Sequence, residues 1–214
     1  MEVKLEVKEI LSCRVRPFLM NVHYARRMPS IQYAFGLFED GEMIGVCTYG
    51  QPASPSLCIG VGGKEYKMRV IELNRLCLLP GKNKPNYASK LVGQSLRKLP
   101  KGLYVVSYAD TAWGHFGAIY QACNFLYTGL SANRTDVYIG NGKHSRHANG
   151  DKNIRQTRSS KHRYIYITGR GGLKNQMLRD LKYEVEPYPK GESVRYDYTD
   201  PKPVESVKVY RKET

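Results

Sequence analysis

The sequence has no long apolar run, and none of its hydrophobic stretches approaches the roughly 20 residues that a membrane-spanning helix needs. The opening MEVKLEVKEI also lacks the apolar core of a signal peptide. We therefore expect a cytoplasmic protein with no membrane partner. At 214 residues, the chain is long enough to bury one good core but short for two independent domains.

Cysteine and phenylalanine are both scarce. The five cysteines are odd in number, widely spaced and contain no CxxC pair, which argues against a disulfide framework and against a zinc ribbon. We expect most of them to be reduced core residues, and we expect no metal site. Five phenylalanines stand beside 17 tyrosines. Tyrosine joins an apolar ring to a polar hydroxyl, which suits surfaces that are partly exposed to solvent and also suits stacking on nucleic-acid bases.

Acidic residues are too few to balance the basic ones. Lys and Arg number 34 against 19 Asp and Glu, which gives a formal net charge of +15 and favours a polyanionic partner, nucleic acid first. The most one-sided run lies in the segment 141–163. A solvated loop is one interpretation, but we favour an arm that follows the phosphates of a nucleic acid. Its candidate ligands are Lys143, Arg146, Arg155, Arg158, Lys161 and Arg163.

Hydrophobic periodicity predicts a mixed α/β sheet, because strand and helix patterns alternate along the middle of the chain. Asp40-Gly41 between two apolar runs predicts a hairpin. The run Val70–Leu79 predicts a central strand, and a second buried strand is expected at Leu103–Tyr108. The other expected elements are a helix within residues 2–20, hairpin strands at Tyr33–Phe38 and Met43–Tyr49, a loop at Gln51–Ser56, helices at 87–99 and Gly117–Leu126, strands at Asp136–Ile139 and Arg163–Thr168, and an extended tail from Pro187.

Three sequence blocks stand in order within residues 70–130: Glu72-Leu73-Asn74-Arg75-Leu76, Ser107-Tyr108-Ala109-Asp110 and Gly114-His115-Phe116-Gly117. With the following Ile119-Tyr120-Gln121-Ala122 and Asn124, they resemble the phage Mom family, within the broader pattern of GNAT acyltransferases. The resemblance implies a GNAT-like acyltransferase fold with a basic C-terminal extension, phage origin and a place in the host cytoplasm. It also implies conversion of adenine in double-stranded DNA to its N6-carbamoylmethyl form, which blocks host restriction enzymes.

The resemblance sets the expected domain boundaries and the expected donor. We expect a catalytic domain over residues 1–170 and a C-terminal helix and extended tail over 171–214. Acetyl-CoA enzymes of the GNAT class hold pyrophosphate on a Gly-rich loop before a helix, but here that place has one glycine, Gly81, and a proline that lacks a backbone donor, Pro85. We therefore favour glycyl-tRNA as donor over an acyl-CoA. The candidate donor-binding residues are Lys82, Lys84, Asn86 and Ser89.

The candidate catalytic residues follow the second buried strand. Asp110 is expected to accept a hydrogen bond from the adenine amino group, although a helix-capping carboxylate is the alternative. Tyr120 matches the tyrosine that protonates the leaving group in GNAT enzymes, and a buried core tyrosine is the alternative. His115 can act as a base near neutral pH, or can be held by the backbone at a helix start. Ser107 completes the catalytic set.

The candidate substrate-binding residues lie on both strands and near the N-terminus. Glu72, Asn74 and Arg75 stand in an otherwise apolar strand, where a charged side chain without a partner is unfavourable, so at least one of them should face the cleft. Glu72 and Arg75 can equally form a structural ion pair. His23 and Tyr24 are expected to line the pocket of a flipped adenine. Tyr108 and Asn124 complete this set.

Two rival functions stay open at this point. An ordinary N-acetyltransferase would bind acetyl-CoA without DNA, and a DNA-binding regulator would bind DNA without changing the mass of its nucleosides. Iron has been raised for the family that the sequence resembles, but the sequence shows no clear ligand cluster for it.

Overall fold

A mixed seven-stranded sheet forms the body of the protein. The computed structural model describes residues 3–138, 151–192 and 208–211. The order of the strands is β1-β2-β3-β4-β5-β9-β6, and only β4 and β5 run parallel. These strands are β1 (Leu5–Glu9), β2 (Tyr33–Glu39), β3 (Glu42–Gly50), β4 (Val70–Leu78), β5 (Tyr104–Asp110), β9 (Lys161–Ile167) and β6 (Leu126–Leu130). The predicted mixed α/β fold is confirmed, as are the hairpin and the two central strands.

The prediction of a first helix within residues 2–20 is wrong at its start. Residues Leu5–Glu9 form β1, which pairs antiparallel with β2, and helical structure begins only at the short 3-10 helix η1 (Ser12–Val15), which the π-helix η2 (Phe18–Val22) follows. The sequence LEVKE alternates apolar and charged residues, so its period of two fits an edge strand. The helical spacing of apolar residues within 2–20 comes from this strand and the short helices after it taken together as one segment.

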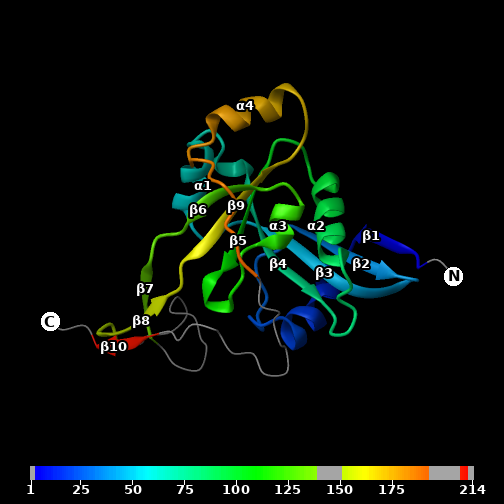
Figure 1. Cartoon of the computed structure of the whole chain (residues 1–214), viewed down its shortest axis with the longest axis horizontal. Helices are drawn as coiled ribbons and strands as arrows, with labels where there is room; N and C mark the ends of the chain where they lie inside the picture. The colour runs from blue at the N-terminus through cyan, green and yellow to red at the C-terminus, as the bar shows by residue number, and fades with distance from the viewer. Residues whose placement is uncertain (1–2, 139–150, 193–207, 212–214) are drawn as a thin grey trace.

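Helices cover both faces of the sheet (Figure 1). The amphipathic α2 (Tyr87–Lys98) packs Leu91, Val92 and Leu96 against β1–β5 and lies beside the short α3 (Ala118–Ala122). On the opposite face, α1 (Pro55–Gly62) and α4 (Gly172–Asp180) pack against β5 and β9. Strand β5 is buried on both sides, which explains its unbroken apolar sequence.

Two predicted elements end or begin elsewhere. The expected loop at Gln51–Ser56 is shorter, because Ser54 caps α1 and a proline opens that helix at Pro55. The helix expected at Gly117–Leu126 ends at Ala122, since Asn124 adopts a left-handed backbone with φ of 57°. Residues after it form β6, which pairs with β9.

A second, three-stranded sheet extends from the body beyond β6 and β9 (Figure 1). It consists of β7 (Arg134–Val137), β8 (Ile154–Arg158) and β10 (Val209–Arg211), all antiparallel. The strand expected at Asp136–Ile139 is therefore β7, two residues earlier, and the strand expected at Arg163–Thr168 is β9. Most of the described part of the basic segment forms strands, in β8 and at the start of β9, with short turns before and between them. The C-terminal strand β10 returns to this sheet.

The cysteines agree with the expectation from the sequence. All five cysteines are free, and Cys47, Cys58 and Cys77 are buried, as predicted. Among the described helices, none is both long and apolar enough to cross a membrane.

Candidate active site

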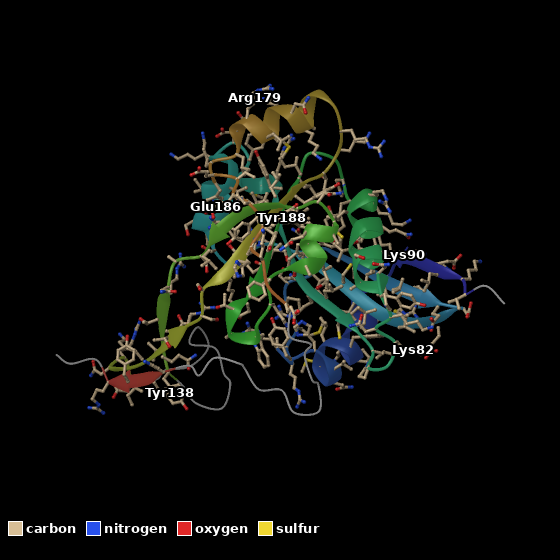
Figure 2. The ribbon with its side chains drawn as sticks, viewed as in Figure 1. Lys82, Lys90, Tyr138, Arg179, Glu186 and Tyr188 are labelled. Atoms are coloured by element: carbon tan, nitrogen blue, oxygen red, sulfur yellow. The ribbon has the colours of Figure 1, made fainter. Side chains whose placement is uncertain are left out.

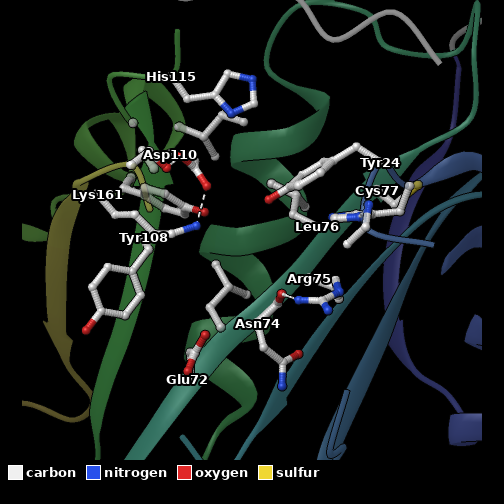
Figure 3. Close-up of a pocket in the computed structure, with 18 of the residues that line it drawn as sticks. Tyr24, Glu72, Asn74, Arg75, Leu76, Cys77, Tyr108, Asp110, His115 and Lys161 are labelled. Atoms are coloured by element: carbon white, nitrogen blue, oxygen red, sulfur yellow. Dashed lines mark hydrogen bonds and ion pairs between the residues drawn. The ribbon is translucent and has the colours of Figure 1, made fainter. Parts of the chain in front are cut away.

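A deep cleft opens where the two parallel strands separate. Strands β4 and β5 pair only over Val70–Glu72 and Tyr104–Val106, after which they separate, and β4 continues paired with β3 alone while β5 continues paired with β9 alone. The cleft between them has a volume of about 1910 Å³, and side chains from both strands project into it (Figure 3). Open α/β sheets commonly place ligands at this position, outside the carboxyl ends of the strands.

Most of the predicted site residues line this one cleft. They are His23, Tyr24, Glu72, Asn74, Arg75, Lys84, Asn86, Ser89, Tyr108, Asp110, His115, Tyr120, Arg158, Lys161 and Arg163. Four predicted residues do not line it, namely Lys82, Ser107, Asn124 and Arg155. Two more, Lys143 and Arg146, lie outside the described residues.

Glu72 is a half-buried carboxylate at the point where the strands part (Figure 3). Among the described residues, no hydrogen bond or ion pair reaches it, so the proposed ion pair with Arg75 is not formed. Burial raises its pKa, an effect that the charges of Arg75, Lys161 and Arg27 only partly oppose. A carboxylate with a raised pKa and no partner is suited to accept a proton from a ligand.

Arg75 supplies an unused donor to the same cleft. One of its terminal nitrogens donates to the backbone carbonyl of Asn74, while its Nε is buried and has no hydrogen-bond partner among the described residues. Burial lowers the pKa of the guanidinium, which stays charged at neutral pH. Asn74 itself links strands, because its side chain accepts from Thr48 and donates to the Ser30 carbonyl.

An aromatic wall stands near Arg75. The rings of His23 and Tyr24 stack at 4.4 Å, and Tyr24 meets Trp113 at 5.0 Å. Burial lowers the pKa of His23 to about 3, with smaller effects from Arg75, Arg27 and His115. Since its Nδ1 accepts from the backbone N–H of Ala25, the neutral ring carries its proton on Nε2.

Asp110 ends β5 and is only 8% exposed. One carboxylate oxygen accepts from the backbone N–H of Ala112 and from the Ser159 hydroxyl, and the other pairs with Lys161. Asp110 therefore both caps the short helix that follows it and lines the cleft. A carboxylate offers about four acceptor sites, so one is left for a ligand.

His115 lies on the loop after Asp110, and Tyr120 lies on the helix α3 that follows. Burial raises the pKa of Tyr120 to about 12, with a smaller opposing effect from the nearby Ser107 hydroxyl. The phenol is therefore protonated at neutral pH. Burial lowers the pKa of His115, which favours its neutral form. Ser107 is fully buried and donates to the Leu73 carbonyl, so it links β5 to β4 beneath the cleft.

The predicted donor-binding lysines are already engaged. Lys82 and Lys84 both contact Glu39, at 3.3 and 2.7 Å, and Lys82 also contacts Glu42. Tyr87 donates to the same Glu39 carboxylate at 2.7 Å. In the free protein the two lysines are thus neutralised, and their role in donor binding stays a prediction. Asn86 and Ser89, at the start of α2, line the cleft.

We expect the Glu39 cluster to make the stability of the fold sensitive to acid. Hydrogen bonds from Lys84 and Tyr87 lower the pKa of Glu39 from 4.5 to about 2. A depressed pKa stabilises the fold above pH 4.5, and this contribution disappears as the pH falls towards 2. The melting temperature of the wild type should therefore drop more steeply over this range than that of Glu39→Gln. Parallel curves for the two proteins would contradict this expectation.

The predicted nucleic-acid ligands that the structure describes are all partly buried and all have partners within the protein. Arg163 is anchored, because it donates to Thr128 and its guanidinium lies 3.5 Å above the ring of Tyr183. Lys161 pairs with Asp110, and Arg158 contacts Asp136 at 3.3 Å. Arg155 donates to the backbone and hydroxyl of Thr135 on the other face of the small sheet.

Sequence reasoning missed several residues of the cleft. Arg27 and Arg134 line it, as do Gln156 and Ser159, and Trp113 extends the aromatic wall. None lies in the three blocks that carried the resemblance, and only the fold brings them to the cleft. For iron, the described residues contain no group of three His, Cys, Asp or Glu side chains placed to hold a metal ion.

The sequence is related to known proteins along nearly its whole length. Residues 4–190 match the profile of the Mom protein family. The relative named methylcarbamoylase mom, from Escherichia phage Mu, is 26% identical over 204 residues, covering 87% of this chain and 84% of the relative.

Similar solved structures are acetyltransferases. One of the GNAT family from Bacillus cereus is 12% identical with a TM-score of 0.46, covering 78% of this chain and 99% of that one. The ribosomal-protein-S18-alanine N-acetyltransferase from Escherichia coli is 10% identical with a TM-score of 0.49, covering 79% and 97% of the two chains.

Proposed function

The chain belongs to the Mom protein family, and we propose that it is a transferase that attaches a carbamoylmethyl-type group to the exocyclic nitrogen of adenine in duplex DNA. Such a modification would protect phage DNA from host restriction. The observation that supports this proposal is the cleft between β4 and β5, which gathers Glu72, Asp110 and Tyr120 in a chain of net charge +15. The relative from phage Mu carries the name methylcarbamoylase.

The target adenine has to leave the duplex to reach this cleft. Its flat ring would stack on the aromatic wall of Tyr24, which lies between His23 and Trp113. The Nε2–H of neutral His23 would donate to a ring nitrogen, and the free acceptor site of Asp110 would hold the amino group. These contacts orient the exocyclic nitrogen towards the donor.

The first chemical step would be aminolysis of a glycyl ester. The adenine amino nitrogen attacks the glycyl carbonyl, the new C–N bond forms, and Glu72 takes the proton that this nitrogen loses. The ester C–O bond then breaks, and Tyr120 protonates the departing ribose oxygen. The unpartnered Nε–H of Arg75 would stabilise the oxyanion of the tetrahedral intermediate.

A rearrangement would complete the reaction. The free amine of the glycyl amide attacks the purine carbon that bears the exocyclic nitrogen. As the new C–N bond forms, the old one breaks, and the original exocyclic nitrogen becomes the terminal amide. The product is N6-carbamoylmethyladenine, and no oxidant or reductant is consumed.

The donor is tested by mixing the protein with a duplex oligonucleotide and glycyl-tRNA whose glycine carries nitrogen-15 in its amine. We expect free tRNA and a modified adenosine in which the label is bonded to the purine ring. Label in the terminal amide would contradict the rearrangement. Modification that depends on an acyl-CoA and releases its free thiol would overturn the tRNA donor.

A further inference from the structure

The small sheet presents two chemically different faces. Side chains alternate along each strand, so Arg134 and Asp136 of β7 share a face with Gln156 and Arg158 of β8. These four residues line the cleft. Arg155 and Thr135 lie on the other face, where they border a separate hollow. The cleft-facing side of β7 and β8 is called the ribbon face below.

Two arginines stand directly opposite each other on the ribbon face. Arg134 and Arg158 are cross-strand partners, and residues so paired lie about 5 Å apart at their Cα atoms. Like charges in this arrangement destabilise a sheet. Asp136 compensates only one of them, through its contact with Arg158. The guanidinium of Arg134 has no hydrogen bond or ion pair within the described part of the chain.

Of the cross-strand pairs between β7 and β8, the pair of Arg134 and Arg158 lies nearest the candidate active site. After Arg158 the chain reaches Ser159 and Lys161, whose side chains both bind Asp110. The charge of Arg134 also reaches Tyr108 on β5, where it partly offsets the rise in pKa that burial causes. The unpaired cation therefore points into the same cleft as the proposed adenine site.

We propose that Arg134 and Arg158 bind a backbone phosphate of the DNA beside the target adenine. A phosphate between the two guanidinium groups would turn their mutual repulsion into attraction, with Arg134 gaining its missing partner. Bidentate binding by arginine would also fix the register of the duplex relative to Asp110. This inference rests on the proposed function.

The position of the ribbon face favours the target DNA over the donor RNA as its ligand. The ribbon face continues the β5 and β9 wall of the cleft, whereas the predicted donor residues Asn86 and Ser89 lie at the start of α2, after β4.

The test compares Arg134→Gln with Arg179→Gln, a variant that removes the same charge from exposed Arg179 on α4, far from the ribbon (Figure 2). Affinity for a duplex oligonucleotide is measured over a range of salt concentrations. For Arg134→Gln we expect weaker binding on every DNA sequence and a salt slope reduced by about one unit. Arg179→Gln should keep the wild-type slope. An unchanged slope in Arg134→Gln would overturn the proposal.

Two further measurements separate the alternatives. The melting temperature of Arg134→Gln should equal or exceed that of the wild type, because a repulsive pair is removed; a lower value would indicate a structural role instead. A loss of tRNA affinity with intact DNA affinity would assign the pair to the donor and contradict our inference. Absence of DNA modification by the wild type would refute the proposed function, whereas a normal slope in Arg134→Gln refutes only the phosphate site.

Discussion

Replacing Glu72 with glutamine should slow adenine modification by about 10²- to 10⁴-fold, the usual contribution of a general base. Glutamine keeps the size of the side chain but cannot take up the proton of the attacking nitrogen. Because no hydrogen bond or ion pair within the described residues involves the Glu72 carboxylate, the substitution breaks no such contact, and the fold should persist. The measurement is single-turnover modification of a duplex oligonucleotide, with DNA affinity recorded in parallel.

The pH dependence of the wild type sharpens this prediction. Burial raises the pKa of Glu72 above 4.5, and the base works only when it is deprotonated. The rate should therefore fall as the pH drops through this raised pKa, and Glu72→Gln should lose that limb of the profile. Glu72→Asp, which keeps a carboxylate but withdraws it, should retain part of the activity. A wild-type rate in Glu72→Gln would remove Glu72 from the mechanism.

Replacing Asp110 with alanine should abolish modification and also destabilise the protein, by about 1.5–3 kcal/mol for a charge-assisted hydrogen bond. Asp110 is 8% exposed, and its carboxylate binds Lys161 and Ser159 at the base of the small sheet, so its loss leaves Lys161 without its partner. Thermal unfolding and modification of the same preparation test both effects. Normal modification by Asp110→Ala would exclude a role for Asp110 in the reaction.

A second variant separates the two roles of Asp110. In Asp110→Asn with Lys161→Met, the amide oxygen can still accept from Ala112 and Ser159, and no cation is left unpaired. We expect the melting temperature to recover in this double variant while modification stays low, because a neutral amide holds the adenine amino group less strongly than a carboxylate. Full recovery of activity would mean that Asp110 serves only as an anchor.

The central part of the fold could be predicted because its signals are local. The apolar run Val70–Leu78 and the amphipathic pattern of α2 depend on residues close together in sequence. The sequence blocks around Glu72 and Asp110 lie on two neighbouring strands, so their meeting in one cleft follows from the topology. Which side chains are free could not be predicted. The Glu39 contacts of Lys82 and Lys84 join residues more than 40 positions apart.

The ribbon was harder to foresee for a physical reason. Strand β7 reads Arg134-Thr135-Asp136-Val137 and lacks an apolar alternation, because its faces meet solvent and a cleft instead of a core. The basic segment suggested a nucleic-acid contact through composition alone. Only the register of β7 with β8 shows that Arg158 faces the cleft with Arg134, while Arg155 faces away.

The most direct test of the account is nucleoside mass spectrometry on plasmid DNA from bacteria that express the wild-type protein or Glu72→Gln. The account predicts an adenosine species heavier by one carbamoylmethyl group with the wild type, and little or none with the variant. Unmodified adenosine in both samples would contradict the proposed function.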